Sequence, residues 1–210
     1  NKNMGQNYCR NLGMKLSTND IVTILDSDDE LLIEDLDKVF DIICEDLSKN
    51  AIYFTPVKFL SKKVSNNPNF NIVNYSDYLK KIKGEYAAFI VKSKLRNEFK
   101  MNFFVQIENC KRSCTDLTFL KYLRKQNILL INYQTRLYND IGTDRISNKN
   151  FSEERLSELI RCNLSIFLQE RFFFIKKAPL IFSLRFLKII FHFLILISIV
   201  IMNHGRASKK

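Results

Sequence analysis

The sequence predicts an α/β domain followed by a basic, apolar tail, and three observations support this fold class. First, residues 21–25 form an apolar, β-branched run, as in a strand covered on both faces of a mostly parallel sheet. Second, helix and strand candidates alternate along the first 170 residues. Third, residues 171–210 contain no acidic residue and carry +8 of the net charge of +11. We therefore divide the chain into a domain over residues 1–170 and a tail over residues 171–210.

Apolar residues at helical spacing predict helices, and short apolar runs bounded by polar residues predict strands. The helices expected on this basis cover residues 5–17, 31–47, 76–83, 151–168 and part of 109–126. The expected strands cover residues 21–25, 51–59, 86–91 and 128–133. Helices that flank a mostly parallel sheet are the arrangement that such an alternation favours.

The first predicted strand ends at a cluster of acids, with four carboxylates among residues 26–30. Sheets of this class bind ligands outside the carboxyl ends of their strands. Crowded carboxylates repel one another, and a hard divalent cation with oxygen ligands compensates for this repulsion. Asp26 and Asp28 are therefore a candidate pair for Mg²⁺ or Mn²⁺ bound to substrate phosphates. The alternative is structural, with Asp28 or Asp29 capping a helix that begins near Leu31.

Two other classes of acidic site disagree with the sequence. A calcium-binding EF-hand loop that starts at Asp26 would need Gly at its sixth position and Glu at its twelfth, where Leu31 and Asp37 stand. A phosphatase of the haloacid dehalogenase type usually has Thr or Val two residues beyond its second Asp, where Glu30 stands.

Asp116 is a further acid of interest, because it lies at or just inside the start of a predicted helix. Its alternative role is that of a plain helix cap.

Three segments, in this order, resemble motifs of the family 2 glycosyltransferases. The segment G-Q-N-Y-C-R-N-L-G at residues 5–13 is similar to the G-x-x-x-A-R-N-x-G helix of that family, with Cys9 in place of Ala. The segment I-V-T-I-L-D-S-D-D at residues 21–29 is similar to its strand and D-x-D-D signature. The segment T-D-L-T-F-L at residues 115–120 is similar to the E-D-x-x-F segment that supplies the catalytic base.

The resemblance implies a GT-A fold, which is Rossmann-like, and an inverting transfer of a sugar from a nucleoside diphosphate to an acceptor hydroxyl. Asp28 would bind the metal, Mg²⁺ or Mn²⁺, that bridges the two phosphates, and Asp26 would be a second ligand or a ribose contact. Asp116 would be the catalytic base, and Arg10 would reach the nucleotide. The acceptor would be a glycan or a lipid-linked sugar in cell-surface polysaccharide biosynthesis.

The sequence departs from the family pattern at two places. Thr115 stands where the family commonly has Glu, which removes one carboxylate and keeps the predicted base. The family also begins with a strand, helix and strand that hold the nucleobase, and these would precede Asn1. We expect that this N-terminal part is missing here. The alternative function is therefore a non-catalytic remnant or interaction module that keeps the fold.

The tail predicts a membrane surface as partner rather than nucleic acid, because its basic residues alternate with long aliphatic runs. Its longest run without a charged residue or His that is almost wholly apolar, residues 193–202, is shorter than the ~20 residues of a membrane-spanning helix. Arg185, Lys188 and His192 would form one polar stripe. We therefore expect amphipathic helices on the cytoplasmic face of the cell membrane, in a peripheral or monotopic protein. The alternative is a buried C-terminal helix that packs on the domain or on a partner. The five cysteines have irregular spacing, which favours reduced thiols.

Overall fold

A computed structural model describes the chain over residues 4–48, 50–60, 71–82, 85–108, 110, 114–139 and 153–207. The chain divides into two compact units. The sheet unit comprises residues 10–103 and 122–144, and the helical unit comprises residues 1–9, 104–121 and 145–210. Parts of three predicted helices, at residues 83, 109, 111–113 and 151–152, lie outside the described residues.

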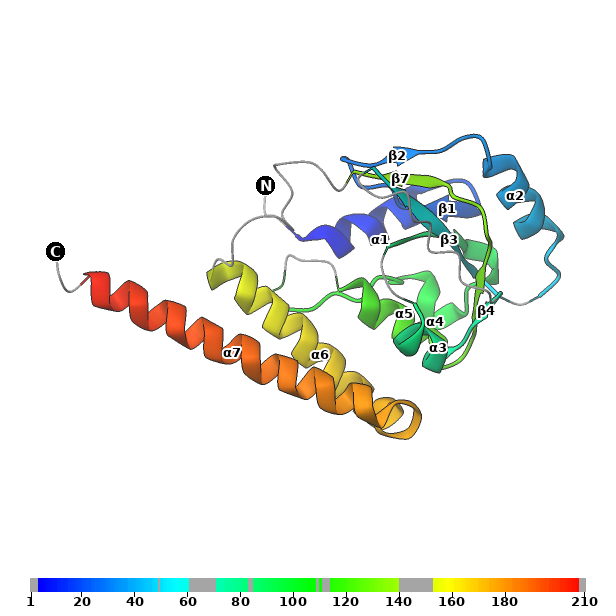
Figure 1. The fold of residues 1–210 in the computed structure, drawn as a ribbon. Helices are drawn as coiled ribbons and strands as arrows, with labels where there is room; N and C mark the ends of the chain where they lie inside the picture. Colours follow the sequence, from blue (N-terminus) through cyan, green and yellow to red (C-terminus); the bar gives the residue numbers. More distant parts are fainter. Residues whose placement is uncertain are drawn as a thin grey trace. The chain divides into compact units, whose positions relative to one another are not determined.

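The sheet unit is built on a seven-stranded sheet, shown in Figure 1. Its main path has the order β1-β5-β3-β6-β4, and β7 pairs with both β3 and β2. The strands are β1 (Ile21–Thr23), β2 (Glu30–Leu31), β3 (Ile52–Phe59), β4 (Ile72–Val73), β5 (Tyr86–Val91), β6 (Ile128–Leu130) and β7 (Arg136–Tyr138).

The prediction of a mostly parallel sheet is wrong. Among the described strands, β3 pairs in parallel with β6 and β7, whereas the β1–β5, β3–β5, β2–β7 and β4–β6 pairings are antiparallel. An apolar run reports burial on both faces and does not encode the direction of the neighbouring strand. β3 satisfies that pattern, because its first six residues are all buried.

β1 also differs from the expected buried strand over residues 21–25. It has three residues and lies at one end of the described strand order, paired with β5 alone. Ile21 and Val22 are half-buried and Thr23 is exposed. The segment is fixed by polar contacts at its start, where the Asp20 carboxylate accepts a hydrogen bond of 2.7 Å from the backbone N–H of Ser93.

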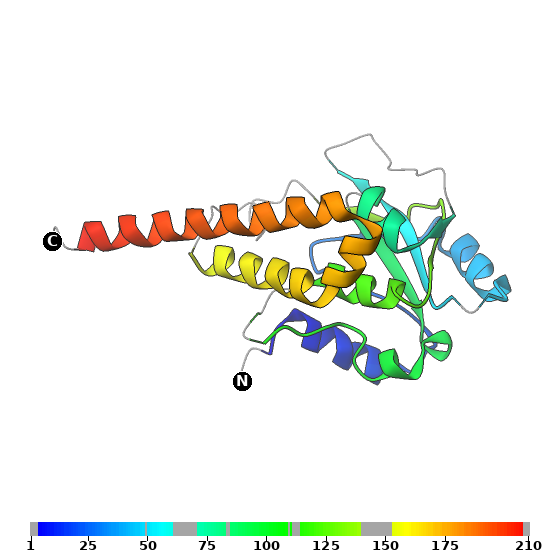
Figure 2. The ribbon, with the colours of Figure 1, turned by 90° about the horizontal axis from the view of Figure 1, so that it is seen from below.

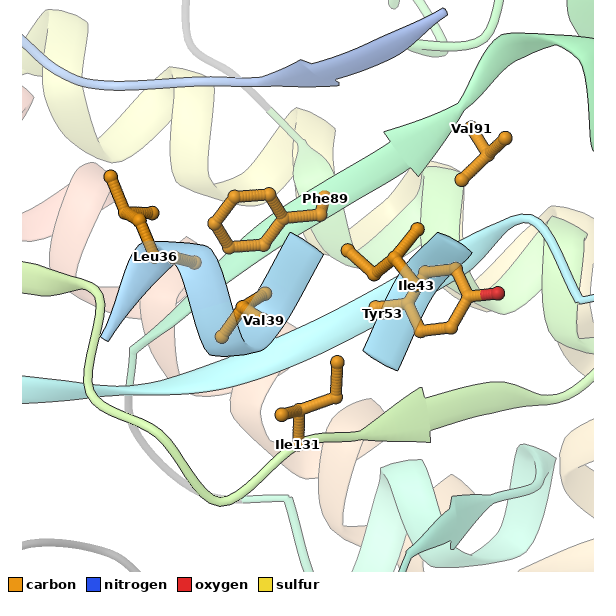
Figure 3. Packing of buried hydrophobic residues seen from close by; sticks show 8 residues of the cluster. Leu36, Val39, Ile43, Tyr53, Phe89, Val91 and Ile131 are labelled. Atoms are coloured by element: carbon orange, nitrogen blue, oxygen red, sulfur yellow. The ribbon is translucent and has the colours of Figure 1, made fainter. Parts of the chain in front are cut away.

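Helix α2 (Leu36–Glu45) covers one face of the sheet and forms the core shown in Figure 3. It begins five residues later than predicted, because residues 30–31 pair with β7 as β2. Its Leu36, Val39 and Ile43 pack against a buried set from the sheet, Tyr53, Ala87, Phe89, Val91 and Ile131. Burying each such aliphatic side chain contributes about 1.5–3 kcal/mol, so this contact accounts for the placement of α2.

The other helices of the described residues, outside the C-terminal pair, are short. They are α1 (Gln6–Leu16), α3 (Tyr75–Lys80), the 3₁₀ helix η1 (Lys92–Lys94), α4 (Asn97–Lys100) and α5 (Thr115–Leu123). The loop after α2 is fixed by Asp46, whose carboxylate accepts hydrogen bonds from the Ser48 N–H at 2.9 Å and the Tyr53 hydroxyl at 2.7 Å. Directly before β3, the backbone N–H of Ala51 donates to the Tyr122 hydroxyl at 3.0 Å.

Two long helices of the helical unit run side by side, α6 (Glu153–Lys177) and α7 (Pro179–Ala207), as Figures 1 and 2 show. α6 extends beyond the predicted end at residue 168 and continues through the predicted domain boundary at residue 170. Pro179 is the first residue of α7, a position where its missing N–H is tolerated. Phe167 of α6 stacks on Phe182 and Phe186 of α7, with ring centroids 4.6 and 5.5 Å apart.

α7 is longer than the apolar run suggests. Residues Pro179–Ile201 form a 23-residue apolar stretch, in which an 18-residue window has a mean hydropathy of 2.4 and is 6% buried within the protein. At 1.5 Å per residue this stretch is about 34 Å long, enough for a hydrocarbon core of ~30 Å. The prediction of a tail too short to span a membrane is therefore wrong in length and composition, because the apolar stretch includes Arg185 and Lys188 and the helix continues through them.

The residues of the predicted polar stripe on α7 differ in exposure. His192 is buried and Arg185 is largely buried, whereas Lys188 is exposed. The exposed positions of the helix are instead mostly apolar, and include Leu180, Leu184, Leu187, Phe191, Leu194 and Ile201. α7 therefore presents apolar side chains outward, as a helix in contact with lipid or with an apolar partner does.

Candidate functional site

The predicted acidic motif forms a tight turn that follows β1, which we call the acid turn (Asp26–Asp29). The backbone N–H of Asp29 donates to the backbone carbonyl of Asp26 at 3.1 Å, the i to i+3 bond of a β-turn. Asp26 is half-buried and Asp28 is exposed. The alternative in which Asp28 or Asp29 caps a helix near Leu31 is wrong, because α2 begins at Leu36. Neither carboxylate of the D-x-D pair therefore caps a helix near Leu31.

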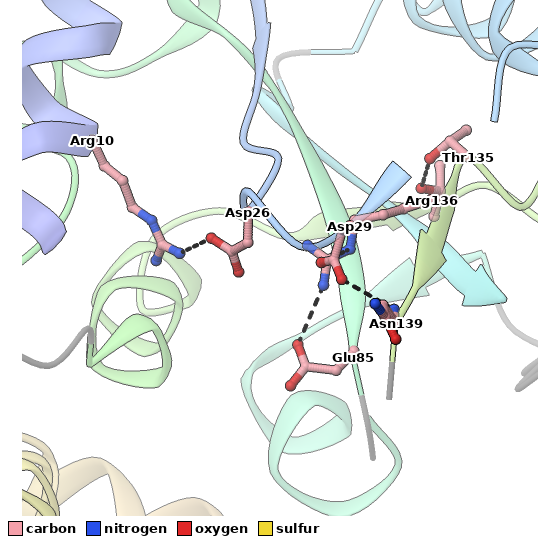
Figure 4. A network of polar contacts seen from close by, with 8 residues as sticks. Arg10, Asp26, Asp29, Glu85, Thr135, Arg136 and Asn139 are labelled. Atoms are coloured by element: carbon pink, nitrogen blue, oxygen red, sulfur yellow. Dashed lines mark hydrogen bonds and ion pairs between the residues drawn. The ribbon is translucent and has the colours of Figure 1, made fainter. Parts of the chain in front are cut away.

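Arg10 connects helix α1 to the acid turn (Figure 4). Its Nη2 lies 3.0 Å from Oδ1 of Asp26, with the two side chains 13% and 38% exposed. A charge-assisted contact of this length restrains the carboxylate as well as neutralising it. The structure therefore brings together two of the residues predicted for the site, Arg10 and Asp26, and leaves Oδ2 of Asp26 on the side away from the guanidinium.

Asp29 anchors the acid turn to the sheet, a role that the sequence analysis did not assign. Its side chain is buried, accepts a hydrogen bond at 3.2 Å from the Asn139 N–H, and lies 3.3 Å from Nε of Arg136 (Figure 4). Glu85 lies 3.6 Å from Nη2 of the same arginine. Burial raises the pKa of Asp29 above 3.8 and outweighs the opposite effect of Arg136, whose contact is ionic without hydrogen-bond alignment.

Asp116, the predicted base, lies in the first turn of α5 and belongs to the helical unit. Its side chain is 53% exposed, and its Oδ2 lies 3.5 Å from Nη2 of Arg185 on α7. Arg185 also lies over the ring of Phe174, with 5.4 Å between the guanidinium carbon and the ring centroid. The structure thus places Asp116 beside a cation of the tail. Its approach to the acid turn stays a prediction.

Comparison with protein families tests the resemblance to the family 2 glycosyltransferases. Residues 1–104 match the model described as glycosyl transferase family 2. The chain carries a family 2 glycosyltransferase domain. The matched residues include α1, β1 and the acid turn, whereas Asp116 lies beyond them. No curated protein matches the chain. The match supports glycosyltransferase activity in general, with a nucleotide-sugar donor and an acceptor.

Family 2 glycosyltransferases often depend on a divalent metal, and the acid turn offers two carboxylates for one. Within the described part of the chain, no group of three or more His, Cys, Asp or Glu side chains has a geometry that could hold a metal ion. Mg²⁺ commonly takes only one or two protein carboxylates together with waters and substrate phosphates. Asp28, which is exposed, and Asp26, which is oriented by Arg10, fit such an ion.

The sequence shows that Asp29 is an acid beside the D-x-D pair, but it does not show what Asp29 binds. A third acid follows the D-x-D pair directly, and its function depends on Arg136 and Asn139, which lie more than 100 positions later. β7 supplies the first of these residues and was not predicted, because a three-residue strand is too short to show a period. The anchor of the acid turn was therefore visible only in three dimensions.

Proposed function

We propose that this glycosyltransferase moves a sugar from a nucleoside diphosphate to an acceptor hydroxyl with inversion of the anomeric carbon. The observation that carries the proposal is the acid turn in a matched family 2 domain, with Asp26 held by Arg10 at 3.0 Å and Asp28 exposed beside it. The buried contacts of Asp29 support the same proposal, because they give the turn a fixed position at the end of β1.

On the donor side, the carboxylates of Asp28 and Asp26 would hold Mg²⁺ or Mn²⁺ against the two phosphates. When bound, the metal offsets the negative charge that develops on the departing diphosphate. Arg10 fixes the orientation of Asp26, so that this residue presents its second oxygen to the metal or to the ribose. These roles divide the turn into two ligands and one anchor, Asp29.

On the acceptor side, Asp116 would act as the general base. It would take the proton of the acceptor hydroxyl while that oxygen bonds to the anomeric carbon, on the face opposite the leaving diphosphate. The half-exposed carboxylate is accessible to an acceptor, and Arg185 restrains it from one side. We assign Arg185 a positioning role in this scheme, since it would act through Asp116.

The acceptor in this proposal is a glycan or a lipid-linked sugar at the cytoplasmic face of the cell membrane, in the synthesis of a cell-surface polysaccharide. The support for a membrane comes from α7, whose 23-residue apolar stretch exposes most of its side chains. The basic residues of the chain beyond residue 170 would favour anionic headgroups. Nucleic acid is not among the proposed partners.

The test is release of nucleoside diphosphate by the full chain in detergent micelles, with a panel of nucleotide sugars and Mn²⁺. We expect Asp28→Ala and Asp116→Asn each to lower the rate by at least about 100-fold, within the range of removed catalytic carboxylates. Asp41→Asn, which removes an exposed acid from α2, is the matched control and should keep the wild-type rate. Equal rates in all four proteins would refute the assignment. No release from any donor would favour the alternative, a non-catalytic interaction module.

A further inference from the structure

Three of the five cysteines gather in the helical unit, although they are far apart in sequence. The Sγ atoms of Cys110 and Cys162 lie 3.6 Å apart, in van der Waals contact. The Sγ of Cys114 lies 3.9 Å from the backbone carbonyl oxygen of Cys162. The remaining two, Cys9 and Cys44, are exposed. Cys110 lies ahead of α5, and Cys162 of α6 lies close to both Cys110 and Cys114.

The three thiols differ in exposure and acidity. Cys110 is partly exposed and its N–H donates to the Ile107 carbonyl at 3.1 Å, whereas Cys114 and Cys162 are buried. A side-chain hydrogen bond with the Cys162 thiol lowers the pKa of Cys114 and, with a backbone hydrogen bond from Leu117, outweighs the effect of burial. The cluster therefore has one member that a small oxidant can reach and a second thiol in contact with it.

We propose that Cys110 and Cys162 form a reversible disulfide, and that this pair is a site of oxidation by a hydroperoxide. The Cys110 thiolate attacks one peroxide oxygen, which breaks the O–O bond and gives a sulfenic acid and an alcohol, or water from hydrogen peroxide. The Cys162 thiol then attacks the sulfenic sulfur, forms the S–S bond and releases water. The peroxide is reduced by two electrons and the two thiols are oxidised.

The geometry requires only a small movement. A disulfide has an S–S length of about 2.05 Å, so the two sulfurs must approach by roughly 1.5 Å, which side-chain rotation of the partly exposed Cys110 can supply. The thiolate of the exposed partner is the reactive species, and the buried partner is protected from further oxidation by its surroundings. Cys9 and Cys44 are each exposed, and neither belongs to the cluster.

The disulfide would tie the segment before α5 to the middle of α6. Cys110 precedes Thr115, the first residue of α5, by five positions, and α5 carries Asp116 in its first turn. The proposal that the Cys110–Cys162 disulfide forms depends only on the positions of the two sulfur atoms. Its effect on turnover, a slower transfer because the segment beside the base is held, rests on the proposed function.

The test uses the full chain with Cys9→Ser and Cys44→Ser, which removes the exposed thiols and leaves the cluster. The protein is treated with hydrogen peroxide, the remaining thiols are blocked with iodoacetamide, and peptides are mapped by mass spectrometry without reduction. We expect a linked peptide pair that contains Cys110 and Cys162, loss of two of the three reactive thiols, and recovery of both with dithiothreitol. Cys114→Ser should keep the linked pair, and Cys110→Ser should abolish it.

Three outcomes would overturn the proposal: no linked peptide at a peroxide dose that oxidises Cys110, a link between Cys114 and Cys162 instead, or links between separate molecules only. These readouts do not depend on activity. A linked pair in a protein without transferase activity would refute the proposed function and keep the disulfide. Transferase activity in a protein that forms no Cys110–Cys162 link would refute the disulfide and keep the proposed function.

Discussion

Replacing Asp29 separates the charge of this residue from its role as a hydrogen-bond acceptor. The carboxylate is buried, accepts a hydrogen bond from the Asn139 N–H at 3.2 Å, and lies 3.3 Å from Nε of Arg136. Asp29→Asn keeps an oxygen for Asn139 and removes the charge. Asp29→Ala removes both and leaves a cavity beside a buried guanidinium. The two variants therefore show whether burial of Asp29 or its ion pair with Arg136 has the larger effect on the free energy of unfolding.

The raised pKa of Asp29 fixes the sign of the expected result. A carboxyl group whose folded pKa lies above 3.8 contributes stability that is fully present below about pH 3.8 and is lost as the pH rises through the folded pKa. Near pH 7 the ionised group is thus less favourable than a neutral one, and we expect Asp29→Asn to stay within about 1 kcal/mol of the wild type. Asp29→Ala leaves the Asn139 N–H without its acceptor, and we expect a loss of about 3 kcal/mol.

The assay is urea unfolding of the full chain in detergent, with nucleoside diphosphate release measured on the same samples. Asp28→Ala is the matched control, because this exposed acid should change stability by less than about 0.5 kcal/mol and still abolish activity. A loss of about 3 kcal/mol in Asp29→Asn would refute the reasoning, since it would show that the charge pair with Arg136 outweighs burial.

Three further changes test other parts of the structure. Hydrogen bonds to Asp46 outweigh its burial and lower its pKa below 3.8, so their stabilisation is present above pH 3.8 and is lost as the pH falls through the folded pKa. Asp46→Asn should therefore show a smaller drop in unfolding free energy than the wild type between about pH 6 and pH 3; an equal drop would contradict this. Tyr122→Phe should cost about 1–3 kcal/mol in urea unfolding, because it leaves the buried N–H of Ala51 without an acceptor, and an unchanged midpoint would speak against that bond. Leu194→Lys on α7 should reduce flotation with anionic liposomes, whereas Leu47→Lys, at an exposed apolar position outside α7, should not; equal flotation of both would count against a lipid contact.

The elements with a strong period were predictable from the sequence. β3 and β5 have nearly the predicted bounds, because each is a nearly continuous run of apolar residues. α1 also has nearly the predicted bounds, although its Tyr8, Leu12 and Leu16 side chains are exposed. β2, β4 and β7 have only two or three residues, and their pairing depends on segments far along the chain. The direction of β5 relative to β3 was missed for a related reason, since burial does not specify direction.

The candidate site was predictable in part. The position of Asp26 and Asp28 after a strand followed from the motif, and the contact of Arg10 with Asp26 is consistent with its place in the first motif. The anchoring role of Asp29 needed Arg136 and Asn139, and the contact of Asp116 needed Arg185 of α7. Long-range ion pairs of this kind leave no local pattern, because each partner has the composition of an ordinary surface charge.

Binding of a nucleotide sugar tests the central claim most directly, because it separates the acid turn from the base. Calorimetry with and without Mn²⁺ would be run on the wild type, Asp28→Asn and Asp116→Asn, with transfer measured in parallel. The account predicts that Asp28→Asn loses the metal-dependent part of the affinity, whereas Asp116→Asn binds the donor as the wild type does and fails to transfer the sugar. Metal-dependent binding that persists in Asp28→Asn, or that disappears in Asp116→Asn, would contradict it.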